Sequence, residues 1–251
     1  MKRLIIFLSL FLLSAQLSWA QDYFTGTIEI RGYGINEAGE EELSDRLILM
    51  MNPDRLLISE FDGIDELDQL TNDSISYALI RHDNRDIVLY GGGNTALKIE
   101  NDQIEALINM MGNLQQQIEE ESEQHDQLDF SETGETKNIE GYRVSKWIIT
   151  DQEEDVTHHV WLSDELRINW GLIAEDWLAQ MTGYADMPLQ EWMRDGNTPL
   201  VIERYEGDQL KDIIRMDRIA HNEVTASRLE IPENLEVVSL QQLIMEQFGG
   251  Q

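Results

Sequence analysis

The hydrophobic pattern of the chain centres on two apolar runs, residues 142–150 and 156–162, which flank an acidic stretch at residues 151–155. Both runs are rich in aromatic and β-branched residues and contain neither Pro nor Gly, a composition typical of β-strands. Side chains alternate between the faces of a strand, and both runs carry apolar groups on both faces. We therefore predict a central β-hairpin with a five-residue connection, covered on both sides.

Other short apolar runs predict further strands on either side of this hairpin. Turn signals such as Asn52-Pro53-Asp54 and Glu206-Gly207-Asp208 separate several of them and predict hairpin connections. The predicted strands are residues 23–33, 46–51, 55–59, 76–81, 86–90, 95–100, 200–205, 210–215, 216–222 and 224–229.

Helical spacing of apolar residues recurs in several places. The longest stretch starts at Asn101, which is suited to cap a helix, and its apolar face runs from Ile104 to Ile118. A second helix is predicted at about residues 170–181, a short helical segment follows from residue 187, and a closing helix covers residues 239–248. The element order favours an α+β, mainly antiparallel fold. We expect a strongly curved sheet or incomplete β-barrel, with amphipathic helices covering its concave side.

The first twenty residues have the pattern of a secretory signal peptide. Lys2 and Arg3 precede a ten-residue apolar run, and Ser18-Trp19-Ala20 provides a cleavage site. The run is shorter than the roughly 20 residues of a membrane-spanning helix. We expect residues 21–251 to form a single exported domain, periplasmic or secreted and without stable membrane insertion. No Cys occurs in the chain, which excludes disulfides, thiolate chemistry and a lipoprotein anchor.

The chain is strongly acidic, with a formal net charge of −31, and the two basic residues of the leader leave −33 for the rest. Binding to nucleic acid depends on Lys and Arg that displace counterions, so this charge argues against a nucleic-acid partner. Most of the acidity fits a solvated surface, and recognition of a cationic partner is the alternative. The sequence leaves the oligomeric state open.

Local motifs of catalysis or metal binding are not evident. His158 and His159 are adjacent on a predicted strand and so point to opposite faces, which disfavours one shared metal ion. The run Gly91-Gly92-Gly93-Asn94 lacks the Lys and Ser or Thr of a phosphate loop. No nucleophile motif stands out either. We therefore predict no catalytic residues, no metal and no cofactor.

Tryptophan and methionine residues gather near the predicted helices and the central hairpin. Methionine is pliable and suits surfaces that accept varied apolar partners, although a Met-rich core is the simpler interpretation. Under the functional interpretation these side chains line an apolar cavity between sheet and helices. The candidate cavity residues are Trp147, Trp161, Trp177, Trp192, Met110, Met111, Met181 and Met193.

One stretch resembles a known family. Thr136, Ile139, Gly141 and Tyr142, followed by Val160, Trp161 and Glu165, match a strand motif of a secreted Gram-negative family known only as a domain of unknown function. That family is similar to the LolA/LolB-type periplasmic lipoprotein carriers. The resemblance implies an incomplete β-barrel with helices at its mouth and an apolar ligand.

Three functions are consistent with the sequence. The first is a periplasmic binding or carrier protein that holds an apolar ligand, such as a lipid, an acyl chain or an acylated protein. The second is an envelope interaction or sensor protein without a small ligand. The third is an unrecognised hydrolase, which would need polar groups with perturbed pKa values converging in a pocket.

Overall fold

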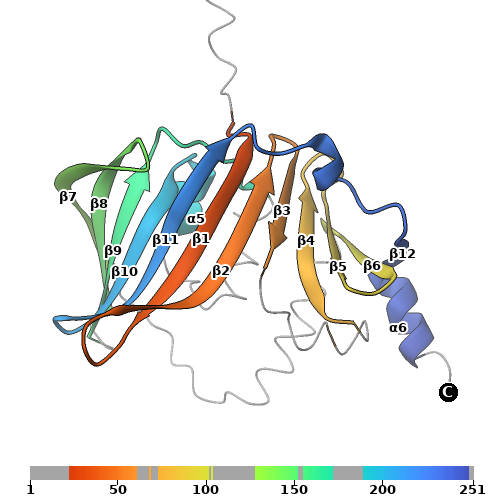
Figure 1. Cartoon of the computed structure of the whole chain (residues 1–251), viewed down its shortest axis with the longest axis horizontal. Coiled ribbons are helices and arrows are strands. Elements are labelled where there is room, and N and C mark those ends of the chain that lie inside the picture. Colours follow the sequence, from red (N-terminus) through yellow and green to blue (C-terminus); the bar gives the residue numbers. More distant parts are fainter. Residues whose placement is uncertain are drawn as a thin grey trace, which may run out of the picture.

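A computed structural model of the chain describes residues 23–60, 68, 73–101, 103, 128–151, 155–171 and 189–248. Within these ranges, twelve strands form one sheet in the order β12-β6-β5-β4-β3-β2-β1-β11-β10-β9-β8-β7 (Figure 1). The strands are β1 (Gly26–Ile35), β2 (Glu41–Met51), β3 (Arg55–Ser59), β4 (Ile75–Arg81), β5 (Asp86–Gly91), β6 (Thr95–Glu100), β7 (Leu128–Ile139), β8 (Tyr142–Asp151), β9 (Val156–Ser163), β10 (Thr198–Glu206), β11 (Gln209–His221) and β12 (Glu236–Ser239).

The predicted central hairpin is confirmed as β8 and β9, which pair antiparallel from Ser145 with Leu162 to Asp151 with Val156. Pairing is antiparallel throughout the sheet except between β12 and β6. The two halves of the chain meet where β1 pairs with β11, far apart in sequence. This pairing joins strands β1–β6 to strands β7–β11 in one continuous layer.

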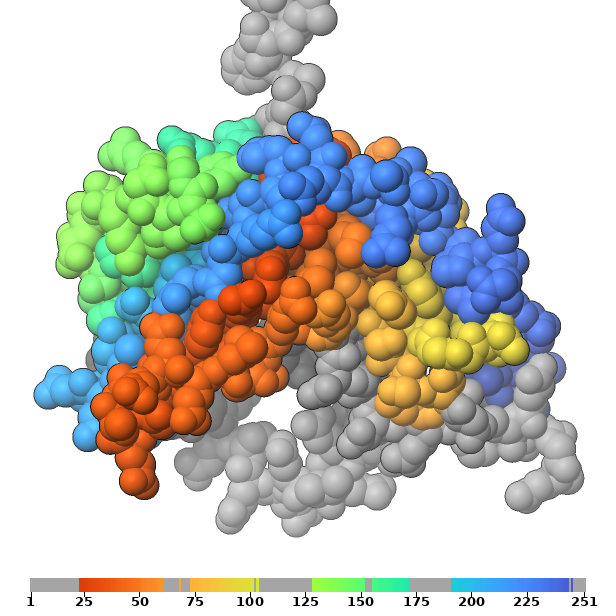
Figure 2. Space-filling view, viewed as in Figure 1, coloured from red at the N-terminus to blue at the C-terminus, as the bar shows by residue number. Residues whose placement is uncertain are grey.

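The strands β1–β6 carry apolar side chains on both faces. On the inner face, Ile28, Leu49, Leu56 and Ile80 belong to the main core cluster. On the outer face, a second cluster is built by alternate residues of β3 to β6 and by Leu229. Leu229 lies in a 3-10 helix, η2 (Ala226–Leu229), and Figure 2 shows this part of the chain in blue across the outer surface of the sheet.

The inner core is completed by an irregular segment, residues 164–171, which we call the strap. Its side chains Leu166, Ile168 and Trp170 are buried in the main cluster. The amide of Phe24 donates to the carbonyl of Arg167 at 2.7 Å, which ties the strap to the start of β1. Extended chain therefore covers apolar surface that we had expected helices to cover.

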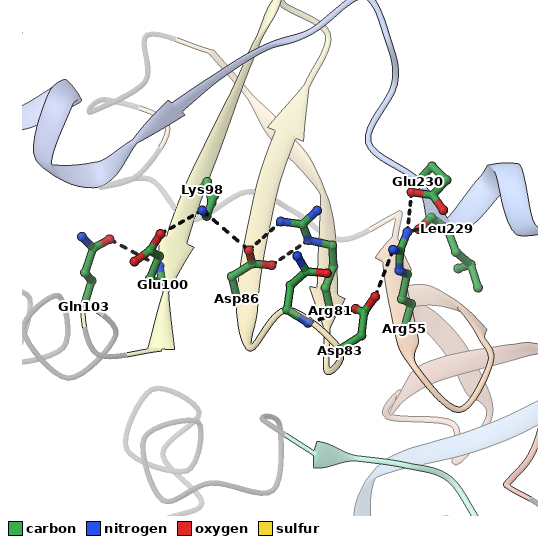
Figure 3. A network of polar contacts seen from close by, with 10 residues as sticks. Arg55, Arg81, Asp83, Asp86, Lys98, Glu100, Gln103, Leu229 and Glu230 are labelled. Carbon is green, nitrogen blue, oxygen red and sulfur yellow. Dashed lines mark hydrogen bonds and ion pairs between the residues drawn. The ribbon is translucent and has the colours of Figure 1, made fainter.

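A network of charged side chains lies along strands β3 to β6 (Figure 3). The side chain of Asp86 is only 3% exposed and accepts two hydrogen bonds from Arg81, at 2.7 and 2.5 Å. Arg55 donates to the carbonyl of Leu229 at 2.9 Å and pairs with the carboxylate of Glu230. The network thereby fixes η2 on the sheet.

The predicted α+β fold, with amphipathic helices over a concave side, is wrong. In the described residues the protein is nearly all β, and the sheet is open between its edge strands β12 and β7. Its two α-helices there are short: α5 (Leu189–Arg194), which packs on β10, and α6 (Leu240–Phe248), which packs beside β12 and β6 at one edge. The physical reason is that, within the described residues, the strap rather than a long helix contributes the side chains that complete the main core cluster. Within the described residues, no helix is long and apolar enough to cross a membrane.

Other element predictions had mixed outcomes. The short helical segment with Trp192 and the closing helix are confirmed as α5 and α6. The strand predicted at residues 224–229 is wrong, because this segment contains η2, and strands β7 and β12 were not predicted. The helix predicted after Asn101 and the one at residues 170–181 lie almost wholly outside the described residues.

Candidate functional site

A pocket with a volume of about 210 Å³ crosses five neighbouring strands, β2, β1, β11, β10 and β9. Two rows of directly paired residues form most of it. In the first row, Asp45 pairs with Gly32, Gly32 with Ile214, and Ile214 with Ile202. The lining residues are Gly32, Tyr33, Ser44, Asp45, His158, Ile202, Arg204, Asp212, Ile213 and Ile214.

The second row of the pocket runs from Asp212 to Arg204 to His158. Directly paired residues share one face of a sheet. Because Gly32 follows the buried inner-face residue Ile28 by an even number of positions on β1, both rows lie on the inner face. The pocket thus lies on the face that carries the main core in strands β1–β6, but it contains charged and polar groups.

Two β-bulges flank the pocket. On β2, Asp45 pairs with Gly32 and Leu43 pairs with Tyr33, which leaves Ser44 as an extra residue. On β11, Lys211 is the extra residue between the pairs made by Asp212 and Leu210. A bulge redirects nearby side chains, and bulges are common beside functional sites. The first bulge allows the neighbouring residues Ser44 and Asp45 both to line the pocket.

Gly32 leaves a hollow in the first row. A Cβ atom placed on Gly32 would lie 3.1 Å from the Ser44 Oγ and 3.3 Å from the Asp45 Oδ2. Any side chain there would therefore compete with these two polar groups for space. Since Gly32 is not among the glycines with positive φ, close approach rather than backbone conformation is what favours glycine here.

The charges on one side of the pocket are balanced. Arg204 donates from Nε to an Asp212 oxygen at 2.6 Å, and from Nη1 to Glu206 at 2.8 Å. Partial burial lowers the pKa of Arg204, but the hydrogen bonds to Asp212 and Glu206 outweigh it and raise the pKa. The guanidinium is therefore permanently charged and already paired.

Asp45, at the other side, is exposed, and its side chain makes no hydrogen bond or ion pair with any residue that the structure describes. Its neighbour Arg46 pairs instead with Glu29, at 2.7 Å, on the outer face. Asp45 therefore remains available as an acceptor.

His158 lies at the far end of the second row. It is 8% exposed, and its Nδ1 atom is buried without a hydrogen-bond partner. Burial lowers the pKa of His158, and the nearby charge of Arg204 lowers it further, so the ring is neutral at neutral pH. A buried polar atom without a partner costs about 1–3 kcal/mol, so a ligand or water that bonds to Nδ1 would be favoured.

The structure brings together only part of the predicted cavity set. Trp147 and Trp192 pack with their ring centroids 5.1 Å apart, in a cluster with Ile149, Val160 and Leu162. Ile202 packs against this cluster and also lines the pocket. The tryptophan pair therefore borders the pocket as packed core and is not part of its lining.

Trp161 lies on the opposite face from Trp147, because Trp147 pairs with Val160, the residue next to Trp161. Trp161 is buried in the main cluster, against which Met193 also packs, and the Lys137 Nζ lies 3.6 Å from the centre of its ring. The remaining candidates fall outside the described residues: Met110, Met111, Trp177 and Met181.

The two adjacent histidines separate as their alternation predicts. His158 lines the pocket, whereas His159 Nδ1 lies 3.6 Å from Glu203 and its ring lies beside Tyr205. The described residues contain no group of three side chains that could hold a metal ion. Of the pocket residues, sequence reasoning had considered only His158, and the signal it lacked is the pairing of strands distant in sequence.

Comparisons with known proteins add little. No family model matches the chain, and no curated protein matches it. Two crystal structures of PNGF-II are similar at 15% sequence identity, with TM-scores of 0.41 and 0.42; they cover 86% and 88% of this chain. The chain spans only 32% of the PNGF-II chain.

An uncharacterized conserved protein from Thermus thermophilus is similar at 10% identity, with a TM-score of 0.36, over 86% of this chain and 91% of that one. TM-scores of this size support no inference about activity. What the fold and the pocket define is a class: an open, mainly antiparallel β-sheet protein with a mixed apolar and polar pocket on its inner face.

Proposed function

We propose that this protein is an exported binding protein that holds the apolar part of a small amphiphile in the pocket on strands β1, β2, β9, β10 and β11. The observation that carries the proposal is Ile214. This large apolar side chain lines the pocket and is 39% exposed, on the sheet face that holds the buried main core in strands β1–β6.

The shape and lining of the pocket support an amphiphile. Ile202 and Ile214 stand side by side in one row and offer an apolar floor, with charged residues at either side. The volume of about 210 Å³ is below the roughly 300–1,000 Å³ of sites that enclose drug-sized ligands. The pocket therefore suits an alkyl or acyl chain end, while the rest of the ligand stays in solvent.

Binding of octyl glucoside, a neutral amphiphile, below its micelle concentration tests the proposal. A ligand that binds only the folded protein raises its melting temperature. We expect a concentration-dependent rise that is lost in Ile214→Ser. Val237→Ser is the matched control, because Val237 is also an exposed branched residue, at 44%, but lies on β12 at the sheet edge.

The control variant should keep the full stabilisation by octyl glucoside. Absence of any stabilisation of the parent protein, or equal loss in both variants, would contradict the proposal. Native mass spectrometry of the same samples gives the number of bound molecules, for which we expect one.

A further inference from the structure

Resting on this proposed function, we infer that the polar end of the ligand is a cation: the hollow over Gly32 receives an alkylammonium group. The ammonium lies beside Asp45 and Ser44, and the alkyl stem follows Ile214 and Ile202 toward His158.

The charges that line the pocket favour a cation. Asp45 and Asp212 each bring a negative charge, Arg204 brings one positive charge, and His158 is neutral. The positive charge of Arg204 is held by Asp212 and Glu206, at 2.6 and 2.8 Å. The lining therefore carries an excess negative charge, located at Asp45, and would repel a carboxylate or phosphate head group.

The register places the excess charge next to the hollow. Asp45 is directly opposite Gly32 on one neighbouring strand, and Ile214 is directly opposite it on the other. Asp212, two residues before Ile214 on β11, is the diagonal neighbour of Gly32, at about 7–8 Å in an antiparallel sheet. Two carboxylates thus flank the only lining position without a side chain.

The bulge on β2 adds a second acceptor at the same place. It lets Ser44 line the pocket beside Asp45, and both side chains would crowd a Cβ at Gly32. An ammonium carries three donors, which a carboxylate and a hydroxyl oxygen can accept, and charge-assisted bonds of this kind are the strong ones.

A histidine at the other end of the pocket supports the inference independently. His158 is buried to more than nine-tenths, lines the pocket, and has an Nδ1 atom without a partner. In the neutral ring this atom can accept a hydrogen bond, so a second donor at the far end of the stem would satisfy it. The pocket therefore has hydrogen-bond acceptors at both of its ends and isoleucine side chains between them. This arrangement matches a ligand whose alkyl stem carries a hydrogen-bond donor at each end.

Three probes of equal chain length test the inference: hexylammonium, 1-hexanol and hexanoate, titrated by calorimetry into the full chain. We expect hexylammonium to bind at least about tenfold more tightly than 1-hexanol, and hexanoate to bind weakest. If 1-hexanol binds as tightly as hexylammonium, or hexanoate binds best, the inference that the polar end of the ligand is a cation is wrong, while the proposed function stands. If none of the three binds, the proposed function fails as well.

Asp45→Asn identifies the acceptor. This variant should weaken hexylammonium about tenfold and leave 1-hexanol within about twofold, since only the charge-assisted bond is lost. Asp164→Asn is the control, because Asp164 is also an exposed Asp but follows β9 at the end of the sheet. Equal weakening of both ligands by Asp45→Asn, or none, would overturn the assignment.

Gly32→Ala fills the hollow, and Gly34→Ala is its matched control on the same strand. A Cβ at Gly34 has nothing within 4 Å, and neither glycine has a positive φ. We expect Gly32→Ala to weaken hexylammonium by about tenfold and Gly34→Ala to leave it unchanged. Equal affinities in the two variants would contradict a site over Gly32.

An alkylammonium group can belong to a free amine or to a lysine side chain. Titration with Nα-acetyl-lysine N-methylamide separates the two sources. Tighter binding of this compound than of hexylammonium assigns the group to a polypeptide, and weaker binding assigns it to a free amphiphilic amine. Binding of neither would overturn the inference.

Discussion

Strands β3–β6 and the five pocket strands differ in how their faces are covered. In β5, residues Asp86 through Tyr90 are all buried, because the inner core lies on one face and the η2 region on the other. In β11, which is more than twice as long, only Ile213 and Met216 are buried. We refer to β3–β6 as the closed half and to β1, β2, β9, β10 and β11 as the pocket half.

The difference shows where a ligand can be accommodated. Coverage on both faces turns every position of a strand into core, and a closely packed core has little free volume. In the pocket half, a glycine, two bulges and a set of charged side chains interrupt the apolar pattern of the inner face. Such interruptions weaken a core, and their concentration at one place is what marks the pocket as a site.

The largest expected effect concerns buried charge in the closed half. Asp86→Asn leaves the mostly buried Arg81 without its carboxylate partner, and removing one member of such a pair costs about 3–5 kcal/mol. Urea unfolding measures this loss. In the pocket half, Asp212→Asn breaks the half-exposed pair with Arg204 and should cost less than about 1 kcal/mol. Equal losses would mean that the halves do not differ in burial.

Apolar side chains give a smaller contrast of the same kind. Leu79 is fully buried at 0% exposure in the outer cluster, so Leu79→Ala should cost about 2–4 kcal/mol in unfolding free energy. Ile214→Ala, at a position 39% exposed, should cost under about 1.5 kcal/mol. The comparison fails if Ile214→Ala destabilises the protein as much as Leu79→Ala does, as a filled core position would.

The smallest effect is a dependence of stability on pH. Burial lowers the pKa of His82, His158 and His159 below the ordinary value of 6.5. Between each lowered pKa and 6.5, the unfolded chain binds more protons than the folded one, so stability is complete above 6.5 and falls as the pH drops below it.

Melting temperatures between about pH 7.5 and pH 5.5, at constant ionic strength, measure this dependence while the carboxylates stay ionised. We expect a decrease toward acid in the parent protein, and a shallower one in His82→Gln and in His158→Gln. A melting temperature that is constant or rises toward pH 5.5 would contradict the burial of these rings, as would variants with the slope of the parent.

The strands that were predicted from sequence are those with a strong local pattern. The β8–β9 hairpin has aromatic and β-branched residues on both faces, and burial on both faces is the reason. β7 was missed because it is an edge strand whose residues are almost all exposed, so its sequence LDFSETGETKNI shows no apolar alternation. The alternation of apolar and polar residues in a strand reflects which side chains are buried, and a solvated edge strand has few buried side chains.

The irregular cover of the inner core was not predicted from the sequence, for a related reason. Apolar residues of the strap, such as Leu166 and Trp170, fill the inner core from an irregular backbone. Because the apolar residues of an irregular segment do not recur at a regular spacing, the sequence gives no pattern from which their burial can be predicted. The pocket was missed because it depends on strand pairing. Asp45 and Ile214 lie on either side of Gly32 only because β1 pairs with both β2 and β11. The place of Ser44 as the extra residue of the bulge likewise depends on the pairing of β1 with β2.

The most direct test of the binding site is a methyl NMR titration of isoleucine-labelled protein with octyl glucoside below its micelle concentration. We predict that the methyl signals of Ile202 and Ile214, in the pocket half, shift together and saturate with one ligand. The signals of Ile80, Ile87 and Ile99 in the closed half should not move. Shifts confined to the closed half, shifts spread over all isoleucines, or no shift at Ile214 would contradict the account.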